Sequence, residues 1–170
     1  MLVHIVNKQP NARMCFVCGT HNDLGLKARF YELENAQLLG VFKGLDAHQG
    51  YPAHMHGGII VALLDEVIAR AIQIHEPDNW GITSDLSVRY VKPVPLDQTL
   101  MVVGKVTRNR RRLFEGEAYM IDESQNILAM VTARYIKRKA DEVFADAAKV
   151  DEHWLSLADD DDLKSVELPL

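Results

Sequence analysis

Residues His56 to His75 read HGGIIVALLDEVIARAIQIH, and this stretch determines the fold that we predict. Apolar side chains recur every three or four positions along it, which is the period of one helix face. We therefore expect a helix that begins at Gly57 and ends near His75, where Glu-Pro-Asp-Asn (76–79) breaks it. Because most other positions are apolar too, the helix must be covered on most of its sides.

Six strand-like segments flank this helix, two before it and four after it. They are residues 26–31, 37–43, 82–91, 99–107, 113–121 and 127–137. In the third segment, alternation puts Ile82, Leu86, Val88 and Tyr90 on one face and Thr83, Asp85, Ser87 and Arg89 on the other. A curved antiparallel sheet of about six strands wrapped around one long central helix accommodates this order, so the expected fold class is α+β.

The chain is long enough for one domain, which we place at residues 1–139, followed by a tail at residues 140–170. The tail begins with a helical spacing of apolar residues at Val143, Phe144, Ala147, Val150 and Trp154. It continues into the acidic run 159–162, which we expect to be solvated and mobile because like charges repel.

The composition restricts the classes of function. A net charge of −5 argues against non-specific nucleic-acid binding as the main task. The longest apolar run, residues 59–64, is far too short to cross a bilayer, and the N-terminal sequence MLVHIVNKQP lacks the features of a secretory signal. With only two cysteines, close together, a reducing cytoplasm is the expected location.

Asp65 is the residue that the helix pattern does not explain. Helical spacing places it in an apolar stripe with Val61 and Ile68. Burying an unpaired carboxylate costs several kcal/mol or raises its pKa until it binds a proton. Its neighbour Glu66 has an ordinary explanation, because Arg70 lies four residues further on as an ion-pair partner. Asp65 is therefore the first candidate for a functional residue.

The start of the helix is a second candidate site. Unpaired N–H groups at Gly57 and Gly58 favour negative charge, such as the oxygen of a developing tetrahedral intermediate. Asp65 follows eight residues after Gly57, roughly 12 Å along the axis at about 1.5 Å per residue. One helix cannot easily present both features to one small carbonyl group. Two antiparallel helices can, which predicts a two-fold dimer with two composite sites.

Four sequence motifs, in this order, resemble those of hotdog-fold acyl-CoA thioesterases of the phenylacetate-degradation type. The first is the box Cys15-Phe-Val-Cys-Gly with Asn22 and Gly25-Leu26, and the second is His48-Gln-Gly-Tyr-Pro. The third is His56-Gly57-Gly58 followed after six residues by Asp65, and the fourth is Tyr90-Val-Lys-Pro-Val-Pro-Leu. The resemblance covers roughly residues 15–137, and the ordered set of motifs is more specific than any one motif.

The resemblance implies a hotdog fold, assembly as a homodimer or a dimer of dimers, and hydrolysis of an acyl-CoA without a cofactor. Asp65 would be the general base or nucleophile, the Gly57 N–H would polarise the thioester carbonyl, and Thr83 would hold the attacking water. His56 would place the loop near that carbonyl. The remaining residues expected at the substrate are Gly58, His48 and His54. The chain departs from many relatives at His54 and at Gly50, so the acyl group is not specified.

Two further groups could bind ligands. Arg108, Arg110, Arg111 and Arg112 lie in a predicted turn, where Arg110 and Arg111 would suit CoA phosphates; a solvated turn is the alternative. Metal-like spacings occur at His48, His54 and His56 and at Cys15, Cys18 and His21. We expect loop histidines that form hydrogen bonds, and cysteines that pack as small apolar side chains rather than a zinc site or a redox pair. No metal is predicted.

Two alternative functions share this fold. A non-catalytic hotdog module could bind acyl-CoA or an aromatic acid as a sensor, and saturable binding without turnover would identify it. An enoyl-CoA hydratase of this fold would carry a histidine six residues after the catalytic aspartate. That position is Ala71, which argues against the hydratase.

Overall fold

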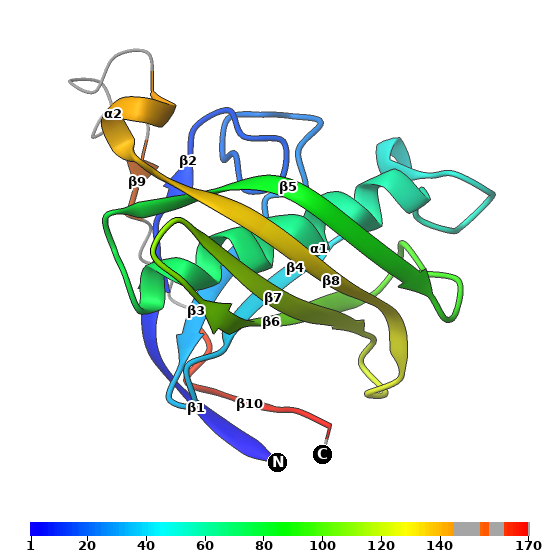
Figure 1. Ribbon diagram of the computed structural model, residues 1–170. Coiled ribbons are helices and arrows are strands. Elements are labelled where there is room, and N and C mark those ends of the chain that lie inside the picture. The colour runs from blue at the N-terminus through cyan, green and yellow to red at the C-terminus, as the bar shows by residue number, and fades with distance from the viewer. Residues whose placement is uncertain (145–153, 157–161, 170) are drawn as a thin grey trace.

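The computed structural model describes residues 1–144, 154–156 and 162–169. An eight-stranded antiparallel sheet curves around one central helix, α1 (Gly57–Ala71), as Figure 1 shows. The strands in sheet order are β10 (Ser165–Glu167), β1 (Leu2–Gln9), β3 (Arg29–Leu33), β4 (Leu38–Lys43), β6 (Thr99–Asn109), β7 (Leu113–Ile121), β8 (Ile127–Lys139) and β5 (Asn79–Tyr90).

Short elements complete the described fold. They are the 3-10 helices η1 (Asp46–His48) and η2 (Ile72–Ile74), the helix α2 (Ala140–Val143), and the two-stranded pair of β2 (Asn11–Ala12) with β9 (Trp154–Leu155). No helix among the described residues has the length and apolarity needed to span a membrane.

The main core lies between α1 and the concave face of the sheet. Leu64, Ile68 and Ile72 are fully buried there, as their helical spacing predicts. Two glycines let the sheet approach the helix closely. An ideal Cβ on Gly104 would lie 2.5 Å from Cγ1 of Val67, and one on Gly116 would lie 2.3 Å from Cγ2 of Ile68. Any side chain at these positions would therefore push the helix away from the sheet.

The predicted fold class is confirmed, because one central helix is wrapped by a curved antiparallel sheet. The six predicted strands are all present, although several are longer than expected. The count of about six is wrong, since β1 and β10 add two strands at one edge. They are held by a second apolar cluster that includes Val3, Leu33, Val166 and Leu168, and the two ends of the chain lie side by side there (Figure 1).

The tail differs from the prediction. The helix α2 ends at Val143, and Trp154 lies in the strand β9 rather than in a continued helix. Ala147, Val150 and residues 159–161 lie outside the described residues. Asp162, the last member of the acidic run, is not free in solvent. It forms an ion pair with Lys8 at 2.7 Å and accepts a hydrogen bond from the Tyr31 hydroxyl at 3.1 Å.

Candidate functional site

Asp65 lies in the middle of α1, half-buried and held by two hydroxyl groups from the sheet. Its Oδ1 accepts hydrogen bonds from Oγ1 of Thr83 at 2.9 Å and from the Tyr135 hydroxyl at 2.8 Å. The same hydroxyl of Tyr135 lies 3.0 Å from the backbone oxygen of Asp65. In the described part of the chain, no lysine, arginine or histidine forms an ion pair with Asp65. The carboxylate is therefore positioned by neutral donors alone.

This environment shifts the titration of Asp65. Burial raises its pKa above the ordinary value, and the nearby charge of Glu66 acts in the same direction. The hydrogen bonds from Tyr135 and Thr83 favour the ionised form and limit the rise. A raised pKa makes a carboxylate a stronger base, which suits removal of a proton from water.

A β-bulge places Thr83 beside the helix. The register between β5 and β8 shifts between Thr83 and Asp85, so one extra residue on β5 reverses the alternation. Thr83 therefore points toward α1, and so do Leu86 and Val88, which pack against the core. Ile82 is turned outward and is 45% exposed. The prediction that Thr83 and Leu86 lie on opposite faces, with Ile82 beside Leu86, is wrong for this reason.

Tyr135 is a site residue that the sequence analysis missed. It lies on β8 directly opposite Thr83, is fully buried, and stacks on Phe114 with ring centroids 4.8 Å apart. Burial raises the pKa of Tyr135, and the neighbouring Asp65 raises it further, so this hydroxyl stays protonated and acts as a donor. The sequence feature that could have identified it is a tyrosine among the alternating apolar residues of a buried strand.

The first turn of α1 offers one backbone donor. His56 is the N-cap residue, and its Nδ1 accepts the Gly58 N–H at 3.0 Å. The Gly58 N–H is therefore already used, whereas the Gly57 N–H forms no hydrogen bond within the described residues. The hydroxyl of Tyr90, a residue of the fourth motif that was not predicted as a site residue, donates to the Gly57 carbonyl oxygen at 3.0 Å.

A mostly apolar hollow of about 560 Å³ opens beside this turn. Its walls include Tyr51, His54, Gly57, Ile60 and Tyr90. The hollow can accept an apolar chain next to the Gly57 N–H. Asp65 does not line it, so one chain does not bring the carboxylate and this donor to one ligand atom. This matches the separation expected from helix geometry.

The histidines of the preceding loop have structural partners. His48 is buried, its Nδ1 accepts the Leu45 N–H at 2.9 Å, and its Nε2 donates to the Leu24 oxygen at 2.7 Å. Both ring nitrogens are thus occupied within the chain, so His48 presents neither to a substrate. His54 is exposed and forms a 2.9 Å hydrogen bond with the Pro52 oxygen. Among the described residues, these histidines form no metal-ligand group.

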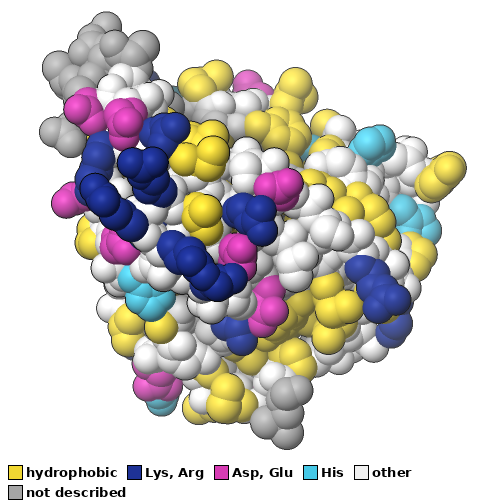
Figure 2. All heavy atoms as spheres, in the orientation of Figure 1, with side chains coloured by type: hydrophobic (Ala, Val, Ile, Leu, Met, Phe, Trp, Pro, Cys, Tyr) yellow, Lys and Arg dark blue, Asp and Glu magenta, His cyan; other side chains and the backbone are white. Residues whose placement is uncertain are grey.

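The predicted basic turn is part of a larger basic cluster. Arg110 and Arg111 are exposed at the turn between β6 and β7. Arg111 and Arg112 line a polar hollow of about 450 Å³ together with residues 137–139 at the end of β8. Lys137 is paired with Glu76 at 2.7 Å. Figure 2 shows lysine and arginine side chains gathered on this face of the molecule.

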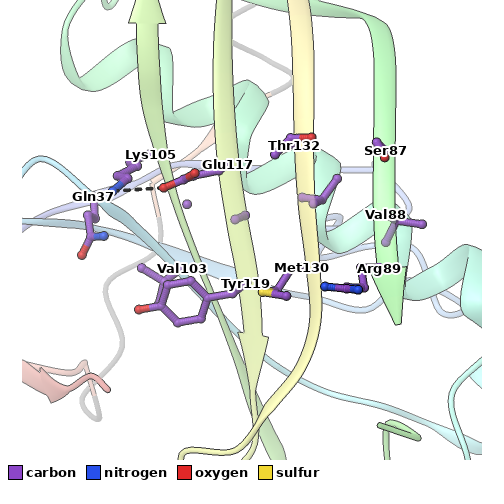
Figure 3. A pocket seen from close by; sticks show the side chains of 13 residues that line it. Gln37, Ser87, Val88, Arg89, Val103, Lys105, Glu117, Tyr119, Met130 and Thr132 are labelled. Atoms are coloured by element: carbon purple, nitrogen blue, oxygen red, sulfur yellow. Dashed lines mark ion pairs between the residues drawn. The ribbon is translucent and has the colours of Figure 1, made fainter. Parts of the chain in front are cut away.

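A further hollow of about 410 Å³ lies on the sheet face opposite to α1 (Figure 3). Two rows of cross-strand neighbours line it. The first row is Val103, Tyr119, Met130 and Arg89; the second is Lys105, Glu117, Thr132 and Ser87. Lys105 and Glu117 form an ion pair at 3.1 Å. None of the predicted site residues lines this hollow, so it is separate from the candidate site.

Comparisons with known proteins agree with this fold. Residues 53–129 match the thioesterase superfamily. Mouse acyl-coenzyme A thioesterase THEM4 is 28% identical over 111 residues, which cover 65% of this chain and 47% of THEM4. The chain thus spans about half the length of the THEM4 proteins of mouse and rat that it matches.

Solved structures are similar over most of the chain. The thioesterase superfamily protein RHA08564 has a TM-score of 0.67 and 27% identity, covering 73% of this chain and 60% of that one. A hypothetical thioesterase from Streptococcus pneumoniae, solved with coenzyme A, has a TM-score of 0.56 and 17% identity, covering 61% of this chain and 82% of its own. Together with the family match, these structures confirm the predicted hotdog thioesterase fold.

Proposed function

From the match of residues 53–129 to the thioesterase superfamily, we propose that this chain hydrolyses an acyl-CoA thioester to a free acid and CoA. The observation that carries the proposal is the state of Asp65. It is a half-buried carboxylate with a raised pKa, and both of its hydrogen-bond donors are neutral hydroxyls on Oδ1. Within the described residues Oδ2 accepts no hydrogen bond, so it is available to a water molecule or to the substrate.

In the proposed reaction, Asp65 acts as general base or as nucleophile. As a base, Oδ2 takes a proton from water while the Thr83 hydroxyl helps to orient that water, and the water oxygen attacks the thioester carbonyl. As a nucleophile, Oδ2 attacks the carbonyl itself and water then hydrolyses the resulting anhydride. In the first case the proton on Asp65 passes to the departing CoA sulfur, and in the second CoA leaves as a thiolate that takes a proton from water. In both cases the negative carbonyl oxygen needs a donor that Asp65 cannot supply.

We place this donor, the Gly57 N–H, on a second copy of the chain. Its N–H is unused and lies at the positive end of the α1 dipole, beside the apolar hollow. The strand β5, which carries Thr83, is the last in the sheet order, so among the described residues its outer edge has no strand neighbour. Two copies that meet at this edge, related by a two-fold axis perpendicular to α1, would set their α1 helices antiparallel.

This arrangement offers one surface for the acyl group of an acyl-CoA and another for its phosphates. The apolar hollow beside Gly57 would take the acyl group. The basic cluster would take the phosphates, through Arg111 and Arg112. Residues 137–139 of this cluster belong to β8, the strand that also carries Tyr135, and Lys139 is four residues or roughly 13 Å from Tyr135 at about 3.3 Å per residue. The extended pantetheine arm of CoA can span that distance.

The first experiment is free-thiol release from a panel of short, long and aromatic acyl-CoAs. Turnover of at least one thioester is the expected result. Saturable binding of acyl-CoA without turnover would contradict the hydrolase and identify a sensor instead.

The composite site is tested separately by mixing subunits. Gly57→Pro removes the N–H at a helix position where proline is well tolerated, and Gly57→Ala keeps the N–H with a similar new contact to Tyr90. Mixing inactive Gly57→Pro with inactive Asp65→Asn should restore activity, because each mixed dimer contains one intact site. With random exchange, about a quarter of the wild-type rate is expected for a two-fold dimer. No recovery after verified subunit exchange would place both groups in one chain.

A further inference from the structure

A second cluster of reactive side chains lies behind the Asp65 site, between α1 and the loop after β2. One sulfur from Cys15, one from Cys18 and a carboxylate oxygen of Glu66 all lie within 4.8 Å of one another. Arg70 joins them: its Nη2 donates to Cys18 Sγ at 3.0 Å, and its Nε donates to Glu66 Oε1 at 2.7 Å. Arg70 thus links its ion-pair partner Glu66 to the cysteines.

The two sulfurs differ in accessibility. Cys18 is fully buried, and its Sγ also accepts the Ala12 N–H at 3.3 Å. Cys15 is only partly buried, and it lines a hollow of about 250 Å³ whose walls include Trp80 and Trp154. A small molecule can therefore reach Cys15, with Cys18 directly behind it.

The backbone holds both sulfurs on one side of a tight turn. The Gly19 N–H donates to the Cys15 carbonyl oxygen at 2.7 Å, and the Val17 N–H donates to Cys15 Sγ at 3.3 Å. An ideal Cβ on Gly19 would lie 2.2 Å from that carbonyl oxygen, so this turn cannot accept a side chain there.

The pair shares protons unequally. A hydrogen bond from the Cys18 thiol lowers the pKa of Cys15 to about 6, although burial and the charge of Glu66 act against the shift. The same hydrogen bond raises the pKa of Cys18, which burial raises further and Arg70 opposes. At neutral pH the pair is therefore one thiolate and one thiol, the state from which thiol oxidation begins.

A divalent metal fits this cluster poorly. The described residues offer three ligands, and the buried guanidinium of Arg70 already binds two of them, Cys18 and Glu66. A structural zinc ion needs four ligands and would lie beside this cation.

We propose that Cys15 and Cys18 form a peroxide-sensitive dithiol that closes to a disulfide. The Cys15 thiolate attacks one oxygen of a hydroperoxide, the O–O bond breaks, and the products are a sulfenic acid and hydroxide or alkoxide. The Cys18 sulfur then attacks the sulfenic sulfur, and the displaced hydroxide takes the thiol proton as water. The pair loses two electrons, and the peroxide gains them. The Cys18 thiol and the Val17 N–H supply Cys15 with the stabilisation that a helix start gives to the thiolate in other CxxC sites.

Formation of the proposed disulfide should be detectable by tryptophan fluorescence. The guanidinium of Arg70 lies 5.2 Å from the Trp154 ring, and Trp154 stacks on Trp80 with ring centroids 5.1 Å apart. These are the only two tryptophans in the chain. Disulfide formation changes the Cys18 sulfur that Arg70 contacts and removes the negative charge of the nearby Cys15 thiolate, so tryptophan fluorescence should change with it.

The test uses the full, reduced chain, treated with hydrogen peroxide, then unfolded in guanidinium chloride and alkylated with N-ethylmaleimide for intact-mass measurement. Untreated protein should carry two adducts. Treated protein should carry none, and its mass should be about 2 Da below that of the reduced chain before alkylation, the mass of two hydrogens. Fluorescence should change at the same rate, and dithiothreitol should reverse both signals. Two adducts after peroxide, or zinc bound at one ion per chain, would overturn the proposal.

Two variants of Cys18 separate the hydrogen bond from the disulfide. Neither Cys18→Ser nor Cys18→Ala can form the disulfide, so both should accumulate a sulfenic acid that dimedone traps. Serine keeps a donor to Cys15 and alanine does not. In a pH profile of iodoacetamide alkylation, the Cys15 midpoint should therefore stay low in Cys18→Ser and rise toward the ordinary thiol value of about 8.5 in Cys18→Ala. If the Cys15 midpoint lies near the ordinary thiol value both in Cys18→Ser and in wild-type protein that has taken up a single alkyl group, the proposed thiolate is contradicted.

Discussion

Two adjacent carboxylates on α1, Asp65 and Glu66, have opposite surroundings. Glu66 is paired with the guanidinium of Arg70 at 2.7 Å, on the side of the helix that faces the cysteines. Asp65 has two neutral hydroxyls, on the side that faces β5 and β8. A paired carboxylate stabilises the fold, whereas one held only by hydroxyls keeps a raised pKa and remains reactive. In the proposed reaction, this difference assigns a structural role to Glu66 and the catalytic role to Asp65.

The largest expected effect is on catalytic activity, which should depend on Asp65 and hardly on Glu66. Asp65→Asn keeps the size and the acceptor oxygen but cannot take a proton, so kcat for acyl-CoA hydrolysis should fall by about a hundredfold or more. Glu66→Gln should retain kcat within a few-fold, because Glu66 contacts Arg70 and not the reacting atoms. Steady-state thiol release on both variants, with dimerisation checked by light scattering, makes the comparison. Equal losses in the two variants would remove the distinction.

The next effect concerns stability. Arg70→Ala leaves Glu66 and Cys18 without their charged donor in a buried environment, and removing one partner of such a pair typically costs about 3–5 kcal/mol. We expect a loss of about 3 kcal/mol in the free energy of unfolding, measured by urea denaturation, because Glu66 is partly exposed. The double variant Glu66→Ala/Arg70→Ala should lose less than the sum of the single variants. A change below about 0.5 kcal/mol for Arg70→Ala would show that the pair is not a structural anchor.

The sequence predicted the residues of this helix well because helical periodicity is local. The i,i+4 spacing of Glu66 and Arg70 identified their ion pair, and the apolar stripe singled out Asp65. Whether the helix start of a second copy completes the site stays a prediction, because it depends on a surface that one chain does not contain.

The partners that lie far away in the sequence could not be predicted. Tyr135 is 70 residues from Asp65, and its position depends on a strand register that a bulge at β5 alters. Arg70 reaches Cys18 across 52 residues, and this contact follows from the path of the loop after β2. The strands β1 and β10 were missed for the same reason, since β10 is short and exists only because the two chain ends meet.

A moderate effect is expected from the two hydroxyls. Tyr135→Phe and Thr83→Val each remove a hydrogen bond that favours ionised Asp65, so its pKa should rise further in both variants. Activity depends on the carboxylate form of Asp65. As the pH is lowered, the variants should therefore lose activity at a higher pH than the wild type does. We expect about a tenfold loss of kcat at neutral pH, partly recovered at higher pH. The pH profile of kcat measures this, and an unchanged acid limb would mean that the hydroxyls do not tune Asp65.

The smallest expected effect is on stability, and neutralising Asp65 should change it in the opposite direction to neutralising Glu66. The folded-state pKa of Asp65 lies above its unfolded value, so ionised Asp65 opposes folding at pH values above the folded pKa. As the pH falls through that pKa the folded protein gains a proton, and this penalty disappears. Asparagine has no such penalty at any pH. Asp65→Asn should therefore be more stable than the wild type at neutral pH, by about 0.5–1 kcal/mol because solvent screens a half-buried group.

The stability difference should shrink as the pH falls toward about 4, the ordinary range of an aspartate. Glu66→Gln serves as the matched control, and it should be less stable than the wild type at neutral pH because it loses its ion pair with Arg70. Thermal unfolding of the three proteins between pH 4 and pH 8 tests both signs. If Asp65→Asn proves less stable at neutral pH, the hydroxyls of Thr83 and Tyr135 compensate the buried charge fully. Asp65 would then be a structural carboxylate like its neighbour.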